Sequence, residues 1–257
     1  MRILDLANTT PKLKLLVYGA SGAGKSTLVG SLLTREELNP CAYLSIDNSG
    51  IVLRNIPGIK AMAMDEPDDA FRFLEAVTVG SLKHCPTVVV DGMGAFLDLC
   101  LVHATEKKSG ALDKRAKGEF VAPPSDIPFT LFNTAYTQMR NFTRAILALD
   151  RVVVVTTWVG TTWPKKKVGN SYERGEIPSS IHPSFPDKIR DNLVGSFDCV
   201  FFVQAGEEQH ALLTRRKDVT MARVRDPNFR KNLEQVILDP DLSEIYQTYL
   251  DSQQSTK

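Results

Sequence analysis

The sequence predicts an α/β fold with a mostly parallel central sheet flanked by helices and with short β-hairpins toward the C-terminal end. Three observations predict it. A glycine-rich motif at residues 19–27 stands between an apolar run and a helix-like segment. Two further apolar runs, at residues 41–46 and 87–90, each end in an aspartate. Because parallel strands bring their carboxyl ends to one edge of a sheet, a ligand site is expected at that edge.

The composition suits one main domain with a small appendage. The 257 residues are 43% hydrophobic and 24% charged, and the net charge of +1 gives no global preference for nucleic acid or membrane. We expect a domain over residues 1–230, followed by a C-terminal helix and a flexible polar tail at residues 231–257. The four cysteines are scattered without a C-x-x-C pair, and no apolar run approaches about 18 residues. A cytoplasmic protein without a membrane segment is therefore expected.

The glycine-rich motif reads G-x-x-x-x-G-K-S, which is typical of a P-loop. The backbone N–H groups of such a loop and of the following helix bind the oxygens of a polyphosphate. Lys25 adds a positive charge for the β- and γ-phosphates, and the hydroxyl of Ser26 is suited to Mg²⁺. A chance glycine-rich turn is the alternative, but the strand before and the helix after favour the P-loop. The residues assigned to ATP binding are Gly19, Ser21, Gly22, Ala23, Gly24, Lys25, Ser26 and Thr27.

Two aspartates follow predicted strands at the same edge of the sheet. Asp91 ends the run Thr-Val-Val-Val-Asp, which has the form of a Walker B strand whose carboxylate holds Mg²⁺ through the water shell of the metal. A helix-capping role is the weaker alternative for Asp91. No second acid follows it, so the group that orients the attacking water must come from elsewhere. Asp47 is the candidate, although Asp-Asn-Ser-Gly is also ordinary turn chemistry and both interpretations stay open.

A helix over residues 129–149 and a buried strand over 151–157 come next. Thr157 would end that strand at the ligand edge, where its hydroxyl can sense a γ-phosphate. A plain strand-end threonine is equally acceptable.

Two segments read as loops, an insertion at residues 103–127 and a long loop at residues 160–186. Exposed, solvated loops are the default interpretation of both. The alternative is a contact with single-stranded DNA, because lysines pair with phosphates and aromatic rings stack on bases. The residues assigned to that contact are Lys107, Lys108, Lys114, Arg115, Lys117, Trp163, Lys165, Lys166, Lys167 and Arg174.

The C-terminal third predicts strands at residues 197–204, 210–214 and 219–224, with a hairpin turn near Gly206, and a helix that ends near residue 250. Arg223 and Arg225 alternate along the last strand, which places both guanidinium groups on one side.

The order of these elements resembles the RecA-like ATPase core. Residues 11–19 and 196–200 look most like the small phage-encoded RecA-like proteins associated with single-strand annealing and recombination. In this resemblance Asp47 takes the place of the catalytic glutamate and is one methylene shorter. Trp158 is a departure at the strand end before the second DNA-binding loop. Arg223 and Arg225 resemble the basic pair that reaches the γ-phosphate bound by a neighbouring subunit.

The resemblance implies ATP, Mg²⁺, single-stranded DNA and a homo-oligomeric ring or filament, in the cytoplasm of a bacterial host. A single-strand DNA-binding protein is a further candidate partner. The implied function is an ATP-dependent DNA-binding protein of recombination that hydrolyses ATP at subunit interfaces. A nucleotide-gated scaffold with little turnover is the second hypothesis, and a small-metabolite kinase ranks last because residues 163–174 contain only one arginine.

Overall fold

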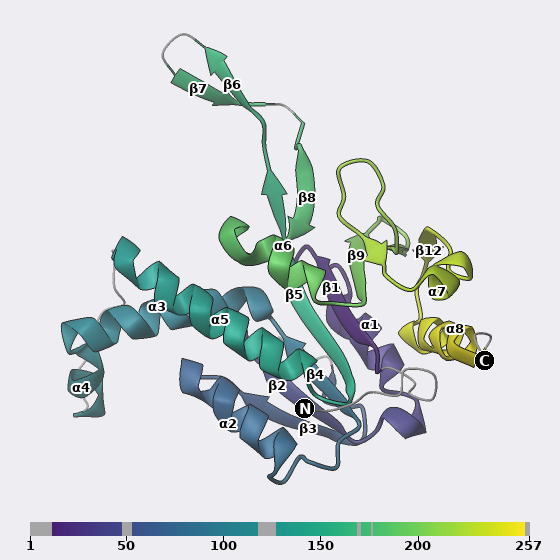
Figure 1. Cartoon of the computed structure of the whole chain (residues 1–257), viewed down its shortest axis with the longest axis horizontal. Helices are drawn as coiled ribbons and strands as arrows, with labels where there is room; N and C mark the ends of the chain where they lie inside the picture. The colour runs from purple at the N-terminus through teal and green to yellow at the C-terminus, as the bar shows by residue number, and fades with distance from the viewer. Residues whose placement is uncertain (1–11, 48–52, 118–126, 169–170, 176, 255–257) are drawn as a thin grey trace, which may run out of the picture.

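One mixed sheet forms the centre of the fold (Figure 1). The computed structural model describes residues 12–47, 53–117, 127–168, 171–175 and 177–254 of the chain. The sheet has ten strands in the order β12-β10-β9-β1-β5-β4-β2-β3, with β11 beside β9 and β8 beside β5. Its parallel strands are β1 (Lys14–Gly19), β2 (Cys41–Ser45), β3 (Ile59–Ala63), β4 (Thr87–Asp91), β5 (Val152–Thr162) and β9 (Cys199–Ala205). The predicted fold class is confirmed.

Helices cover both faces of this sheet, so its central strands are apolar on both sides. Along β5, Val153 and Val155 pack into one core while Val152 and Val154 pack into the other. The first core is closed by α2 (Pro67–Thr78), α3 (Met93–Ser109), α5 (Phe132–Leu147) and α6 (Asp187–Gly195). The second is closed by α1 (Lys25–Leu32), α7 (Pro227–Lys231) and α8 (Leu242–Gln254). Short helical turns are η1 (Glu36–Leu38), α4 (Ala111–Ala116) and η3 (Phe129–Leu131).

The C-terminal part extends the sheet. The hairpin predicted near Gly206 is confirmed, because β10 (His210–Leu213) pairs antiparallel with β9. The strand expected at residues 219–224 is reduced to β11 (Arg223–Val224), and the unpredicted β12 (Val236–Leu238) pairs with β10 at the sheet edge. Helix α8 continues to residue 254 and buries Ser252, so the tail expected from residue 251 is helical there. Residues 255–257 lie outside the described part.

The insertion loop expected at residues 103–127 is wrong for the part that the structure describes. Helix α3 continues through Lys107 and Lys108, and α4 follows directly. The two lysines lie in the last turn of α3, where positive charge is favourable beside the free carbonyls of a helix end. The polar composition therefore marked an exposed helix end. Residues 118–126 of that prediction lie outside the described residues.

The long loop expected at residues 160–186 is also wrong. Strand β5 runs on to residue 162, and β8 (Ser180–Pro183) pairs back on it. Between them, β6 (Lys165–Val168) and β7 (Ser171–Arg174) form an antiparallel hairpin. We call residues 159–183 the arm; Figure 1 shows it standing away from the helical layers. Residues 169–170 and 176 of this segment lie outside the described residues.

Candidate functional site

The P-loop joins β1 to α1 at the carboxyl edge of the parallel strands. Strand β1 ends at Gly19 and α1 begins at Lys25, as the motif predicts. Gly24, the residue that caps α1, has φ 90°, a left-handed backbone conformation that residues with a Cβ rarely adopt. The first turn of α1 presents N–H groups that have no partner within the helix, which makes it a ready site for an anion.

Lys25 lies across the mouth of this loop. Its Nζ donates to the carbonyl oxygens of Gly19 at 3.1 Å and Ala20 at 2.8 Å. Burial lowers the pKa of the Lys25 ammonium, and the negative charges of Asp91 and Asp47 oppose that shift. Lys25 thus lies close enough to Asp91 and Asp47 to interact with their charges, so the structure brings these three predicted site residues together.

Asp91 is the centre of a network of hydroxyl groups. The residue is buried, with 3% of its surface exposed. Ser26 Oγ donates to Asp91 Oδ2 at 3.1 Å, the Tyr43 hydroxyl donates to the same oxygen, and the Thr156 hydroxyl donates to Oδ1. Thr156 Oγ1 also accepts the Gly92 N–H at 3.0 Å. The carboxylate is therefore held in a fixed orientation beside the P-loop serine, although 65 residues separate the two in sequence.

Sequence reasoning missed Tyr43 and Thr156. Tyr43 stands in an apolar strand where it looks like an ordinary core residue, and burial raises the pKa of its phenol. Thr156 directly precedes the predicted Thr157 and faces the opposite side of β5. The available signal was strand alternation, because Val154 and Thr156 share the face that packs against α1.

Asp47 follows β2 and lies over Gly92. A Cβ on Gly92 would stand 2.6 Å from Asp47 Cγ, and Gly92 has φ +88°. Only glycine satisfies both conditions, so Gly92 makes room for the Asp47 carboxylate beside Asp91. Its role in orienting water stays a prediction.

The oxygen atoms around Asp91 fit Mg²⁺, which prefers carboxylate, hydroxyl and water oxygens. Ser26 and Asp91 are the predicted ligands. Ser45 pairs with Asp91 in the β2–β4 register, and its Oγ is buried without a hydrogen-bond partner among the described residues. A hydroxyl left unsatisfied here is suited to a water of the metal shell.

Thr157 is predicted to end its strand, but it lies inside β5 and is fully buried. Its Oγ1 would stand 3.2 Å from a Cβ on Gly94, at the start of α3. It therefore lies on the sheet face opposite α1. Its γ-phosphate role stays a prediction, and Thr156 is the threonine of this strand that contacts Asp91.

Arg223 and Arg225 lie at the edge of the sheet where β9 begins, opposite the P-loop edge. The Arg223 guanidinium donates to the carbonyls of Val194 at 2.7 Å and Phe197 at 3.0 Å. Arg225 donates to the Gly195 carbonyl and stands 3.7 Å from Asp198. Both arginines bind carbonyls at the end of α6, so their side chains lie on the same side of β11. Because they lie far from the P-loop of their own chain, the predicted contact with a γ-phosphate could be made only to the P-loop of a neighbouring subunit.

The predicted DNA-contacting residues form two separate groups. One comprises the exposed Lys107, Lys108, Lys114 and Lys117, with Arg115 on α4, and the other is the arm. Figure 1 shows α4 and the arm at different ends of the molecule. In the arm, the Arg174 guanidinium stacks 3.4 Å from the centre of the Trp163 ring. The sequence placed these residues in two loops, and the structure places them on a helical end and a hairpin.

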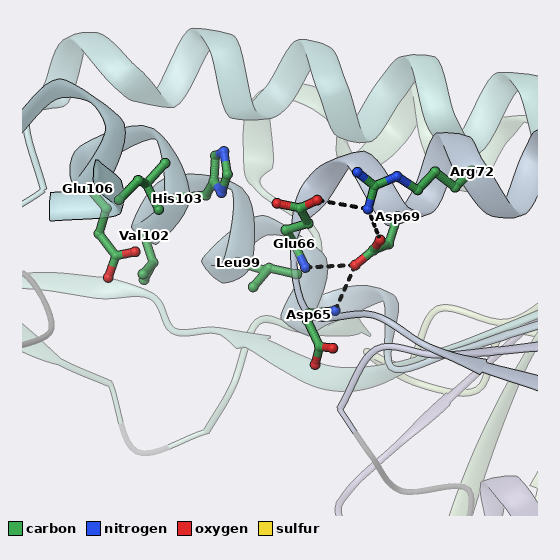
Figure 2. A pocket seen from close by; sticks show the side chains of 9 residues that line it. Asp65, Glu66, Asp69, Arg72, Leu99, Val102, His103 and Glu106 are labelled. Atoms are coloured by element: carbon green, nitrogen blue, oxygen red, sulfur yellow. Dashed lines mark hydrogen bonds and ion pairs between the residues drawn. The ribbon is translucent and has the colours of Figure 1, made fainter. Parts of the chain in front are cut away.

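A cavity of about 410 Å³ lies away from the P-loop, between the start of α2 and α3 (Figure 2). Asp69 accepts the N–H groups of Asp65 and Glu66 at 3.0 Å, and Arg72 pairs with both Glu66 and Asp69. These contacts form a capping box that closes the first turn of α2. We therefore assign this acidic cluster to the helix start.

Within the described residues, no helix combines the length and apolar character that crossing a bilayer requires.

Comparisons with known proteins place this geometry in a family. A family model described as "AAA domain" matches residues 11–232. No curated protein matches the chain. Among solved structures, the pCW3 conjugation coupling protein TcpA, in its monomer form with ATPγS, is 11% identical with a TM-score of 0.39, covering 87% of this chain and 62% of that one.

The Legionella pneumophila ATPase DotB is 13% identical with a TM-score of 0.35, covering 96% of this chain and 54% of that one. The chain thus spans less than two thirds of either structure. The family match covers the P-loop, both aspartates and the arm together. From this match and the geometry of Lys25, Ser26 and Asp91, the chain belongs to the AAA domain family and is a P-loop ATPase.

Proposed function

We propose that this protein is an ATP-dependent single-stranded DNA-binding protein of RecA type, which acts in recombination or annealing and hydrolyses ATP at subunit interfaces. The observation that carries the nucleotide part is the contact between Ser26 and Asp91 beside the P-loop. The arm, with its lysines and the stacked Trp163 and Arg174, supports the DNA part.

The residues of the site divide the work of hydrolysis. The P-loop N–H groups and Lys25 bind the phosphates, and Asp47 orients the attacking water from its place over Gly92. When bound, Mg²⁺ neutralises charge on the phosphate oxygens, and Ser26 and Asp91 would hold it. Tyr43 and Thr156 keep the Asp91 carboxylate in one orientation.

Arg225 completes the site of a neighbouring subunit. Its side chain is 54% exposed and is held by one carbonyl, that of Gly195, and a loose ion pair, so it can turn toward a second copy. Arg223 is half-buried against two carbonyls. An arginine supplied in trans is worth a factor of about 10³ to 10⁵ in turnover. An isolated subunit is therefore a poor ATPase, and DNA raises the rate by aligning subunits.

The arm contacts the DNA backbone through Lys165, Lys166 and Lys167. Each phosphate contact on a single strand contributes about 0.7 to the slope of log affinity against log salt. The triple variant K165E/K166E/K167E is expected to weaken binding of an oligothymidine and to reduce that slope by about 2. Fluorescence anisotropy at several salt concentrations, with and without ATP, measures both quantities.

The pair K107E/K108E at the end of α3 is the comparison variant. It changes two lysines at a different end of the molecule. If this pair lowers the affinity and slope while the arm variant leaves both unchanged, the arm is not the DNA contact. If neither the wild type nor any variant binds DNA, the DNA part of the proposal fails.

A nucleotide-gated scaffold is the second candidate function. Asp47 is one methylene shorter than the catalytic glutamate of the resembled family, which favours binding over turnover. Stable assembly with ATP, without hydrolysis that DNA stimulates, is the outcome that selects it.

A further inference from the structure

A second cavity, of about 220 Å³, adjoins the P-loop on the side of β9 and β10. It is bounded by the loop and the first turns of α1, and by C-terminal residues from the region of β10 and β12. The lining residues that bear on its chemistry are Gly24, Thr27, Leu28, His210, Asp239 and Pro240.

The position of this cavity relative to Asp91 sets which end of a nucleotide it faces. In the sheet, β4 and β2 with Asp91 and Asp47 lie to one side of β1, while β9 and β10 lie to the other. Lys25 and Asp91 serve the γ-phosphate and Mg²⁺ end of a nucleotide. A nucleotide whose phosphates follow the P-loop therefore has its nucleoside on the β9–β10 side, where the cavity opens.

The walls suit a flat aromatic group. Leu28 and Pro240 supply apolar surface. The His210 ring stands 3.3 Å from the position of a Cβ on Gly24, so the ring is packed directly beside the loop. An imidazole ring offers a planar face for stacking, and the Asp239 carboxylate accepts an N–H or O–H. The volume lies below the roughly 300–1,000 Å³ of pockets for drug-sized ligands and is suited to a single base.

The C-terminal wall is held in place by hydrogen bonds that main-chain N–H groups donate. The Asp239 N–H donates to the His210 carbonyl at 2.8 Å, and the His210 N–H donates to Asp239 Oδ1 at 3.1 Å. The Leu242 N–H at the start of α8 donates to Ser31 Oγ on α1 at 2.9 Å. The wall is thus tied to the P-loop helix itself.

We propose that this cavity binds the base of the nucleotide whose phosphates occupy the P-loop, with His210 stacking on the base. The proposal rests on the proposed nucleotide binding at the P-loop. It makes Asp239 and Pro240 a part of the nucleotide site, although the sequence predicts residues 231–257 as a helix and tail that follow the main domain.

The test compares ATP with inorganic tripolyphosphate, which has the phosphates but no base. Isothermal titration calorimetry with Mg²⁺ measures both affinities. The wild type is expected to prefer ATP. Because stacking on an aromatic ring strongly stabilises a base, H210A should weaken ATP binding by about tenfold or more and leave tripolyphosphate binding within about twofold.

Two variants serve as controls. H210F keeps a planar ring and should retain the preference for ATP, whereas E208A changes an exposed side chain in the same hairpin turn and should have no effect on either ligand. D239N keeps a side chain that tolerates the left-handed backbone at this position, φ 43°, and should lower the ratio of ATP to tripolyphosphate affinity.

The outcomes separate the two claims. Equal affinity of the wild type for ATP and tripolyphosphate, or an H210A variant that retains the full preference, overturns the base pocket alone. A wild type that binds neither ligand overturns the P-loop assignment itself. Circular dichroism of each variant shows whether a lost affinity follows from lost folding.

Discussion

The Asp47 carboxylate lies directly over the backbone of Gly92, with its Cγ 2.6 Å from the place where a Cβ on Gly92 would stand. The two residues follow adjacent strands, β2 and β4, whose pairing ends at Ser45 and Asp91. Gly92 therefore has two separate reasons to be glycine, its positive φ and the closeness of Asp47. Each reason predicts a different consequence of substitution.

The variant G92A is expected to lose both stability and ATPase activity. A left-handed backbone costs a residue with a Cβ about 1–2 kcal/mol. The new methyl group also forces the Asp47 carboxylate to turn away from its place in the site, which lowers the activity. Gly110 is a matched control, because it has φ +72° and nothing within 4 Å of its Cβ position. G110A should show only the backbone cost in urea unfolding and should keep its activity. Equal losses in the two variants would refute the contact with Asp47.

The hydroxyl of Tyr43 is expected to stabilise the protein through Asp91. A hydrogen bond to a charged group is worth about 1.5–3 kcal/mol, so Y43F and D91A, each of which removes this bond, should show a coupling energy of that size. Urea unfolding of the two single variants and the double variant gives this energy from a double-mutant cycle. A coupling energy near zero would mean that Tyr43 stabilises the fold through packing alone.

Nucleotide affinity is expected to fall at alkaline pH because of Lys25. In the protein without nucleotide, burial holds the pKa of Lys25 below its usual value of 10.5. Bound phosphates favour the charged form of the lysine. Above the pKa of the free protein, binding must take up a proton, so the Kd for ATP rises by up to about tenfold per pH unit. Titration calorimetry between pH 7 and 10 measures the effect. In K25R the side chain stays charged, and a pH dependence as steep as that of the wild type would assign it to another group.

The trans role of Arg225 predicts complementation between inactive subunits. R225A and K25A should each abolish most ATPase activity, since one lacks the arginine and the other lacks the phosphate-binding lysine. A mixture contains interfaces that join an intact arginine to an intact P-loop and should regain activity. Steady-state assays over a range of mixing ratios measure this recovery, and its absence at every ratio would count against a shared site. R223A should chiefly lower stability, because Arg223 binds two carbonyls at the end of α6.

The parallel core could be predicted because its signals are local. The P-loop spacing and the strands that end in Asp47 and Asp91 follow from residue order, and parallel pairing then brings them to one edge. Tyr43 and Thr156 could not be found in the same way. Their role depends on which face of the sheet carries Asp91, and a shift of one residue along β5 exchanges Thr156 for Thr157.

The two predicted loops failed for a different reason. Lysines at the end of α3 complement the helix dipole, yet in sequence they look like a solvated run. Within the described residues, β6 and β7 at the tip of the arm pair only with each other, so no core periodicity marked them. The base pocket depends on Asp239 standing beside His210, a contact across 29 residues that composition does not reveal.

The steady-state ATPase rate with and without single-stranded DNA, repeated across a salt series, tests the central claim most directly. D91N serves as the inactive reference. We predict a low basal rate and a stimulation by DNA that fades as salt rises, because counterions compete for the phosphate contacts. A rate that DNA leaves unchanged at every salt concentration, with ATP still bound, would contradict the DNA-coupled ATPase.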